Sequence, residues 1–194
     1  KEETRRYVVP SAPGKRHSGD TKVTDLLYKC YGQAILDDDR EEDFEEILKV
    51  IKDRYDSIIN GLELTISLDD EFKTIRENFS KKIGRDYAAS RGEYLNGIIM
   101  AAYLGYEFID AAEVIFFDEE GEFDAEKTNE VLSERLAHTE RAVIPGFYGS
   151  NPDGTIHTFS RGGSDITGSI VARAVHADMY ENWTDVSGFL IADP

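Results

Sequence analysis

One segment of the sequence decides the fold: Phe159-Ser160-Arg161-Gly162-Gly163-Ser164-Asp165-Ile166-Thr167-Gly168. It joins a run of β-forming residues to a run with helical spacing, so we expect a strand, a tight glycine turn and a helix. Alternation of strands with helices in this way is typical of α/β proteins that have a parallel sheet. The rest of the second half continues this alternation, and the mostly helical first half interrupts it.

The same segment carries groups that bind anions. Two adjacent glycines, Gly162 and Gly163, allow backbone N–H groups to approach a ligand closely. The start of the following helix attracts negative charge, and Ser164 or Asp165 can cap it. Arg161 can form two parallel hydrogen bonds with a carboxylate or a phosphate. From spacing alone, an ordinary capped turn with its arginine in solvent explains the segment equally well.

Strands and helices alternate through the rest of the second half. The turn Asn151-Pro152-Asp153-Gly154 lies between two β-like runs and predicts a hairpin. Thr184 and Asp185 follow a predicted strand, where ligands of open α/β sheets bind, although a simple polar turn is the alternative. We expect strands at residues 106–109, 114–117, 141–145 and 179–184, and helices at residues 125–137 and 166–177.

The first half is mostly helical. A strand at residues 5–9 and a loop rich in Pro, Gly and Ser precede segments in which apolar residues recur at steps of three and four. These recurrences predict helices at residues 21–35, 44–61, 72–84 and 90–104. The predicted fold is therefore α/β, with three α/β/α layers, a mainly parallel open sheet and a helical excursion in the first half.

Composition excludes several classes of function. The 194 residues include 22 Lys and Arg against 39 Asp and Glu, a net charge of −17, which argues against binding to a phosphate backbone. No apolar run approaches the roughly 18 residues of a membrane span. The single cysteine, Cys30, excludes an internal disulfide, and its apolar helical neighbours predict a core position. We expect a cytoplasmic protein without nucleic-acid or membrane partners.

Common phosphate and metal motifs are absent from the sequence. Arg16 follows Gly14-Lys15 where a Walker loop needs Ser or Thr, and the four histidines lack the i, i+4 spacing of a zinc site. We therefore predict no metal site. Glu93, in Ser90-Arg91-Gly92-Glu93, is expected near a helix start. It is either a partner of the helix dipole or a carboxylate that holds a substrate ammonium.

Taken together, the motifs resemble those of the amino-acid kinase family, and within it the aspartokinases. Further agreement comes from Val8–Ala12, Thr24–Leu27 and Ser90–Glu93, so the resemblance spans nearly the whole chain. The combination of Arg-Gly-Gly-Ser-Asp with Trp-Thr-Asp is more specific than either motif alone. The segments that carry the resemblance are Pro145-Gly146-Phe147-Tyr148-Gly149-Ser150, Ser160–Asp165, Trp183-Thr184-Asp185-Val186-Ser187-Gly188 and Ala192-Asp193-Pro194.

The resemblance implies ATP-dependent phosphorylation of the side-chain carboxylate of L-aspartate, with Mg²⁺ carried by the nucleotide, in a homo-oligomer. It implies catalytic roles for Arg161, which clamps a substrate carboxylate, and for Asp165, while Glu93 receives the substrate ammonium. The remaining implied contacts form two sets: Ser11, Thr24, Phe147, Ser164 and Asp165 around aspartate, and Gly162, Gly163, Thr184, Asp185, Leu190 and Asp193 around the nucleotide.

The sequence also departs from the family pattern. Such enzymes open with a strand bearing Lys-Phe-Gly-Gly, which holds the transferred phosphate, and continue into paired regulatory ACT domains. We find neither in residues 1–194, so we expect a catalytic domain without its first strand and ACT domains, with little or no kinase activity alone. Lys15 is a candidate substitute for the lysine, in a loop expected to be poorly fixed. Leu190 and Ser187 replace a common Tyr and Pro, which weakens the implied nucleotide contact.

Two alternatives stay open. Within the family, the substrate is instead N-acetylglutamate or a nucleotide, and Glu93 discriminates because a free ammonium requires a carboxylate whereas an acylated nitrogen does not. Outside the enzymes, the chain is a non-catalytic ligand-binding unit, which nucleotide binding without turnover would indicate.

Overall fold

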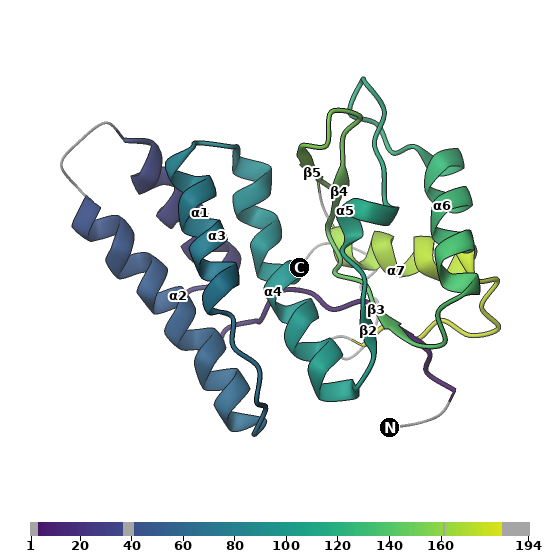
Figure 1. Ribbon diagram of the computed structural model, residues 1–194, viewed down its shortest axis with the longest axis horizontal. Coiled ribbons are helices and arrows are strands. Elements are labelled where there is room, and N and C mark those ends of the chain that lie inside the picture. Colours follow the sequence, from purple (N-terminus) through teal and green to yellow (C-terminus); the bar gives the residue numbers. More distant parts are fainter. Residues whose placement is uncertain (1–3, 37–40, 161, 184–194) are drawn as a thin grey trace.

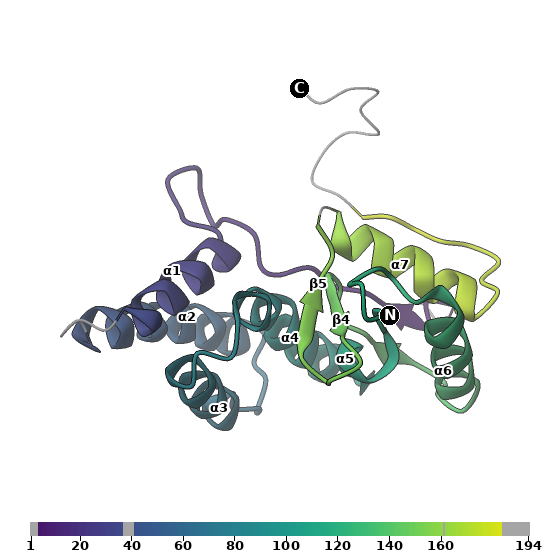
Figure 2. The ribbon, with the colours of Figure 1, turned by 90° about the horizontal axis from the view of Figure 1, so that it is seen from above.

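One long helix, α4, stands between a helical half and a half that contains the strands of the described ranges (Figures 1 and 2). The computed structural model describes residues 4–36, 41–160 and 162–183. The elements, in chain order, are β1 (Tyr7–Val8), α1 (Val23–Ile35), α2 (Glu41–Gly61), α3 (Asp69–Ser80), α4 (Arg85–Leu104), β2 (Glu107–Phe108), α5 (Ala111–Val114), α6 (Ala125–Ala137), β3 (Ala142–Val143), β4 (Tyr148–Ser150), β5 (Ile156–Thr158) and α7 (Gly163–Ala174).

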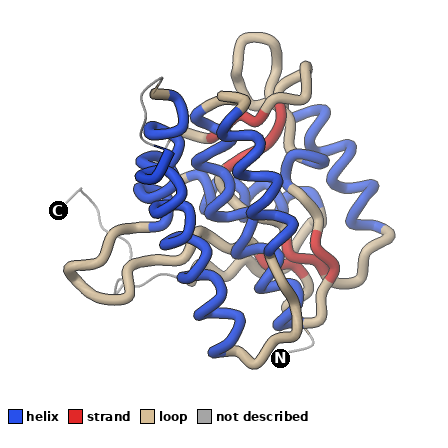
Figure 3. Tube along the Cα trace, turned by 60° about the vertical axis from the view of Figure 1, so that its left-hand side comes forward, coloured by secondary structure: helices blue, strands red, loops and turns tan. Residues whose placement is uncertain are grey.

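Three short strands form a parallel sheet in the order β1-β3-β2. The central strand is β3, whose Ala142 lies opposite both Tyr7 of β1 and Glu107 of β2. Strands β4 and β5 form a separate antiparallel hairpin around residues 151–154. Parallel strands need long crossover connections, and the chain between β1 and β2, which lie on either side of β3, holds four helices. Figure 3 shows how much of the fold is helical around the short strands. The predicted α/β class, parallel sheet and hairpin are confirmed.

The helical half follows from the apolar periodicity of the first half of the sequence. Helices α1, α2, α3 and one face of α4 enclose a core that includes Leu27, Ile51, Phe79 and Leu95. Cys30 is buried in this core, where burial raises the pKa of its thiol to about 12 and keeps it protonated. The predicted helical excursion is therefore confirmed. Within the described ranges, no helix is both long and apolar enough to cross a membrane.

A second core surrounds the sheet. It includes Leu132 of α6, Ile144 after β3, Tyr148 of β4 and Val171 of α7. Helix α4 lies on one side of the strands, and α6 and α7 lie on the other (Figure 1). This order produces the three predicted α/β/α layers. Tyr94 of α4 packs against both cores, so the two halves meet at this helix.

Helix α4 fits between two cores because glycines face its closest neighbours. A Cβ added to Gly97 would lie 2.8 Å from Cγ of Pro145 and 2.9 Å from Cε2 of Phe108. A Cβ added to Gly92 would lie 2.9 Å from Cβ of Ala12. Such distances are shorter than ordinary van der Waals contacts, so neither position has room for a side chain. Other small residues buried along the helix are Ala88, Ala89, Ser90 and Ala101.

Several predicted element boundaries are wrong. Helices α3 (Asp69–Ser80) and α7 (Gly163–Ala174) both begin and end earlier than the predicted ranges 72–84 and 166–177. Helix α4 begins at Arg85, directly after Gly84 with φ of 130°, and not at Ser90. The predicted strand at residues 114–117 is partly helical, because the Asp110 carboxylate accepts a hydrogen bond from Ala112 N–H at 3.0 Å and starts α5. Only Phe116 and Phe117 of that segment form β-bridges.

The strand predicted at residues 179–184 is also absent from its described part, residues 179–183. Side-chain contacts hold this segment instead. Tyr180 lies so close to Gly168 of α7 that a Cβ there would be 2.5 Å from its hydroxyl oxygen. Glu181 forms an ion pair with Arg5 at 2.6 Å. The described part of this segment therefore contacts α7 through Tyr180 and joins no sheet.

Substitution of Gly97 by alanine, compared with the same substitution at Gly32, tests the packing of α4. Gly97→Ala should destabilise the protein by about 1–3 kcal/mol, because its methyl group overlaps Pro145 and Phe108. Gly32→Ala in α1 has no atom within 4 Å of the added carbon and should stabilise by up to about 1 kcal/mol through helix propensity. Chemical denaturation of the full-length protein measures both. Equal effects of the two substitutions would contradict the close packing.

Candidate active site

Three segments that carry predicted site residues meet where β1 and β3 end. Gly146, after β3, donates its N–H to the carbonyl of Pro10, after β1, at 3.1 Å. A Cβ on Gly146 would lie 2.7 Å from Cα of Ser164 in α7. The carboxyl ends of β1 and β3 and the start of α7 are therefore in contact, at the edge where α/β proteins bind ligands.

Phe147 adopts a backbone conformation that is unusual for a bulky residue. Its φ is +82°, a left-handed value that costs about 1–3 kcal/mol without glycine. Hydrogen bonds on both sides hold it there: Phe147 N–H donates to Thr167 Oγ1 at 3.1 Å, and Phe159 N–H donates to the Phe147 carbonyl at 2.9 Å. Strain that is held in this way is typical of a functional site.

The glycine turn before α7 presents free backbone groups. Gly162 is the N-cap with a left-handed φ of 58°, and no side chain of the described residues caps the helix. The prediction that Ser164 or Asp165 caps the helix is therefore wrong. Both are residues of its first turn. Gly163 packs against Phe147, whose Cα would be 2.8 Å from an added Cβ. The first N–H groups of α7 remain available to an anion.

Glu93 is a buried carboxylate with one free oxygen. Glu93 lies in the middle of α4, beyond the first turn, so it is not a partner of the helix dipole. The residue is only 6% exposed, and Oε2 has no hydrogen-bond partner among the described residues. Burial raises its pKa from 4.5 to about 7, although the N–H of Ala12 and the charge of Arg91 oppose this shift. An incoming cation would supply the missing partner.

Ser11 and Thr24 lie in segments that contact the middle of α4. The Ser11 carbonyl accepts a hydrogen bond from the Asn96 side chain at 2.6 Å, one turn beyond Glu93. Thr24 is in the first turn of α1, next to Val23, which packs against Gly92. Both residues therefore lie near the turn of α4 that carries Glu93, and their roles in binding stay predictions.

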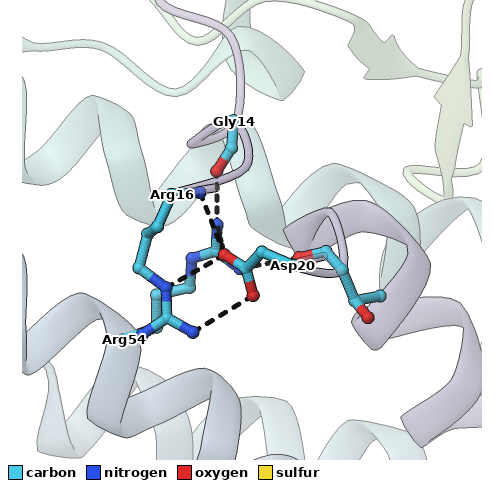
Figure 4. A network of polar contacts seen from close by, with 5 residues as sticks. Gly14, Arg16, Asp20 and Arg54 are labelled. Carbon is cyan, nitrogen blue, oxygen red and sulfur yellow. Dashed lines mark hydrogen bonds and ion pairs between the residues drawn. The ribbon is translucent and has the colours of Figure 1, made fainter. Parts of the chain in front are cut away.

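The loop between β1 and α1 is fixed by Arg54 of α2 (Figure 4). The Arg54 guanidinium is buried, donates to the carbonyls of Gly14 and Thr21, and pairs with Asp20 at 3.0 Å. Arg16 also pairs with Asp20, at 2.9 Å, and its hydrogen bonds hold the pKa of that carboxyl well below its usual range. The expectation of a poorly fixed loop is therefore wrong. The sequence does not reveal this clamp, because Arg54 lies more than thirty residues from the loop.

Five predicted site residues lie outside the described ranges: Arg161, Thr184, Asp185, Leu190 and Asp193. Their roles stay predictions. The described part of the site combines a buried carboxylate with an oxygen that lacks a partner, a strained backbone turn and an uncapped helix start. The first suits an ammonium group and the last suits an anion, so the arrangement fits a small molecule that carries both charges.

Fold and geometry thus define an α/β protein with a candidate ligand site at the carboxyl edge of a parallel sheet. The model of the amino acid kinase family matches residues 4–194. The chain belongs to this family.

Several relatives and solved structures are similar over the whole chain. Aspartokinase 3 of Bacillus subtilis is 37% identical over 205 residues, which cover 98% of this chain and 44% of the relative. The crystal structure of Clostridium acetobutylicum aspartate kinase is 50% identical, covers 100% of this chain and 44% of its own, and has a TM-score of 0.89. Escherichia coli aspartokinase III in complex with aspartate and ADP is 24% identical, with a TM-score of 0.76 over 94% of this chain and 43% of its own, and shows a shared fold. The chain therefore spans less than half the length of these proteins.

The raised pKa of Glu93 predicts a pH-dependent stability. The folded protein holds the proton of the Glu93 carboxyl group more tightly than the unfolded chain does. The contribution of this proton to the free energy of unfolding is therefore complete below pH 4.5 and is lost as the pH rises through about 7. In the Glu93→Gln variant, the amide side chain cannot ionise. The ligand-free variant should therefore gain stability relative to wild type between pH 5 and pH 8, by up to about 3 kcal/mol. Denaturation of the full-length protein at several pH values measures this difference.

Glu77→Gln is the control for that experiment, because Glu77 is exposed on α3. It removes one carboxylate without touching the site. A stability difference for Glu93→Gln that does not change with pH would contradict the buried, ionisable carboxylate.

Proposed function

We propose that the full-length protein containing this chain transfers the γ-phosphoryl group of ATP to the side-chain carboxylate of L-aspartate. The observation that carries the proposal is the buried Glu93 carboxylate, whose Oε2 has no partner among the described residues. A free ammonium group satisfies this oxygen and neutralises its charge. The aspartokinase names of the similar proteins support the same substrate.

Each site residue receives a role in this proposal. Glu93 binds the substrate ammonium, and Arg161 binds a substrate carboxylate through two parallel hydrogen bonds. Residues of three neighbouring segments complete the amino-acid pocket: Ser11, Thr24, Phe147, Ser164 and Asp165. The N–H groups at Gly162 and Gly163 orient phosphate oxygens, and further nucleotide contacts come from Thr184, Asp185, Leu190 and Asp193.

The reaction needs positioning more than acid–base chemistry. The aspartate side chain is ionised at pH 7, so one of its oxygens attacks the γ-phosphorus without a general base. The bond from that phosphorus to the bridging oxygen breaks, ADP leaves with the electron pair, and an acyl phosphate forms. The helix start at Gly162 supplies oriented N–H donors for charge on the phosphate. Mg²⁺ arrives with the nucleotide and neutralises its phosphates.

The same carboxylate argues against an acylated substrate. N-acetylglutamate has a neutral amide nitrogen, which would leave Glu93 either charged and unpaired or protonated. An amino acid with a free ammonium avoids both costs. The proposal extends to a cytoplasmic homo-oligomer, in keeping with the biosynthetic character of the reaction.

A hydroxamate-trapping assay tests the function directly. The full-length protein with ATP and Mg²⁺ should form an acyl phosphate from L-aspartate, and little or none from N-acetylglutamate or a nucleoside monophosphate. Nucleotide binding without turnover of any of these acceptors would favour the non-catalytic alternative.

Proton release tests the role of Glu93. Its pKa of about 7 means that most Glu93 side chains are protonated at pH 6 in the free protein. An ammonium ligand lowers this pKa, so aspartate binding at pH 6 should release close to one proton. Titration calorimetry in buffers with different ionisation enthalpies measures this release. Glu93→Gln should release none and should weaken aspartate binding much more than ATP binding.

The Glu77→Gln variant again serves as the control and should match wild type in both respects. A larger effect of Glu93→Gln on ATP than on aspartate would move Glu93 out of the amino-acid pocket.

A further inference from the structure

Arg91 is a buried cation that forms no ion pair with the described residues. The residue is only 5% exposed, and no carboxylate of the described residues lies within 4 Å of its guanidinium. Its two hydrogen bonds both go to the hydroxyl of Ser90, from Nε at 3.1 Å and from Nη2 at 2.8 Å. Because a buried charge without a carboxylate is costly, other groups must stabilise it.

Three tyrosine rings surround the guanidinium. Its central carbon lies 4.2 Å from the ring centroid of Tyr94, 4.5 Å from that of Tyr87 and 5.4 Å from that of Tyr148. A cation over an aromatic face is attracted by the electron density of the ring, and the attraction increases when water is excluded. The planar guanidinium is well suited to this stacking, whereas an ammonium is compact and strongly hydrated.

Two of these tyrosines connect Arg91 to distant carboxylates. The Tyr94 hydroxyl donates to Glu71 of α3 at 3.0 Å, and the Tyr148 hydroxyl donates to Asp110 at 2.7 Å. Burial, and then the facing carboxylate, raises the pKa of both phenols, so they remain protonated donors. Each ring therefore has a carboxylate at its hydroxyl and the Arg91 cation over its face.

This network crosses the junction between the two halves. Glu71 belongs to the helical half, and Asp110 and Tyr148 belong to the half that contains the sheet. Tyr94 packs against both cores. Arg91 therefore links α3 and α4 to the end of β2 and to β4.

The network also lies between the two sides of the amino-acid pocket. Glu93 is two residues from Arg91 on α4, and Phe147 directly precedes Tyr148. Residues two apart point to different faces of a helix, so Arg91 holds the sheet half while Glu93 faces the loop after β1. A shift of α4 relative to β4 would change the separation between Glu93 and the turn at Phe147.

We propose that Arg91 is a positioning residue, which fixes the Glu93 carboxylate relative to the Phe147 turn and thereby sets recognition of the substrate ammonium. The inference rests on the proposed function. It is distinct from that function because Arg91 acts through the tyrosines and through α4, without touching the substrate.

The test compares substitutions in the full-length protein. Arg91→Met keeps the length of the side chain but removes the charge, and Arg91→Lys keeps the charge over the rings. Arg85→Met is the matched control on the same helix, since the exposed Arg85 guanidinium lies 4.4 Å from the ring of Tyr28, which is not one of the three tyrosines around Arg91. The readouts are the KM for aspartate, the Ki of succinate, the KM for ATP and direct aspartate binding by calorimetry.

Succinate separates positioning from general destabilisation, because it has the two carboxylates of aspartate without the ammonium. Arg91→Met should raise the KM for aspartate by about 10-fold or more, since a displacement of the order of 1 Å is sufficient for such losses. The Ki of succinate and the KM for ATP should stay within about 2-fold of wild type. Arg91→Lys should recover part of the loss, and Arg85→Met should leave all values unchanged.

Tyr148→Phe provides a second variant in case Arg91→Met does not fold. It keeps the ring but removes the hydrogen bond to Asp110, so it should weaken aspartate in the same selective way but to a smaller extent. Equal losses for aspartate and succinate, or an unchanged KM for aspartate, would overturn the role of Arg91. Wild type that binds no aspartate would overturn the proposed function and, with it, this inference.

Discussion

Helix α4 has to pack against two hydrophobic cores at once, and the positions of the site residues follow from this constraint. Glycines and alanines allow the approach of the loop after β1 on one side and of Pro145 and Phe108 on the other. A helix that is buried all round leaves little freedom to rotate or slide. It is therefore a rigid support for a carboxylate such as Glu93, and rigid supports favour precise recognition.

Two opposite charges are buried on this helix, and they are stabilised in different ways. Arg91 has tyrosine faces and a serine hydroxyl around it, so its charge is compensated within the protein. Glu93 has an oxygen without a partner, and its raised pKa reflects that deficit. The missing hydrogen-bond partner at Glu93 therefore destabilises the ligand-free protein, and a bound substrate can supply that partner. No such deficit exists at Arg91 within the described residues. The ion pair between Lys49 and Asp53 is exposed to solvent, so it affects stability less than these buried charges do.

The sequence by itself determined the class of fold and the identity of most candidate residues. Apolar spacing predicted helices such as α1 and α6 closely, because each periodic face is long enough to overcome local alternatives. The Asn-Pro-Asp-Gly turn predicted the hairpin, because its residues adopt turn conformations in almost any context. Local chemistry was sufficient in these cases. It failed at residues 179–183, which form no strand and contact α7 through the Tyr180 side chain.

Only the tertiary structure decided how those residues act. The sequence left Glu93 between a helix-dipole partner and a substrate ligand. Its position in the middle of α4 excludes the first role, and its burial supports the second role, which stays a proposal. The left-handed Phe147 and the clamp of Arg54 on the loop after β1 had no local signal. Both depend on contacts between residues far apart in the chain. Burial, strain and hydrogen bonding at such contacts are set by the packed neighbours, and local sequence patterns do not encode them.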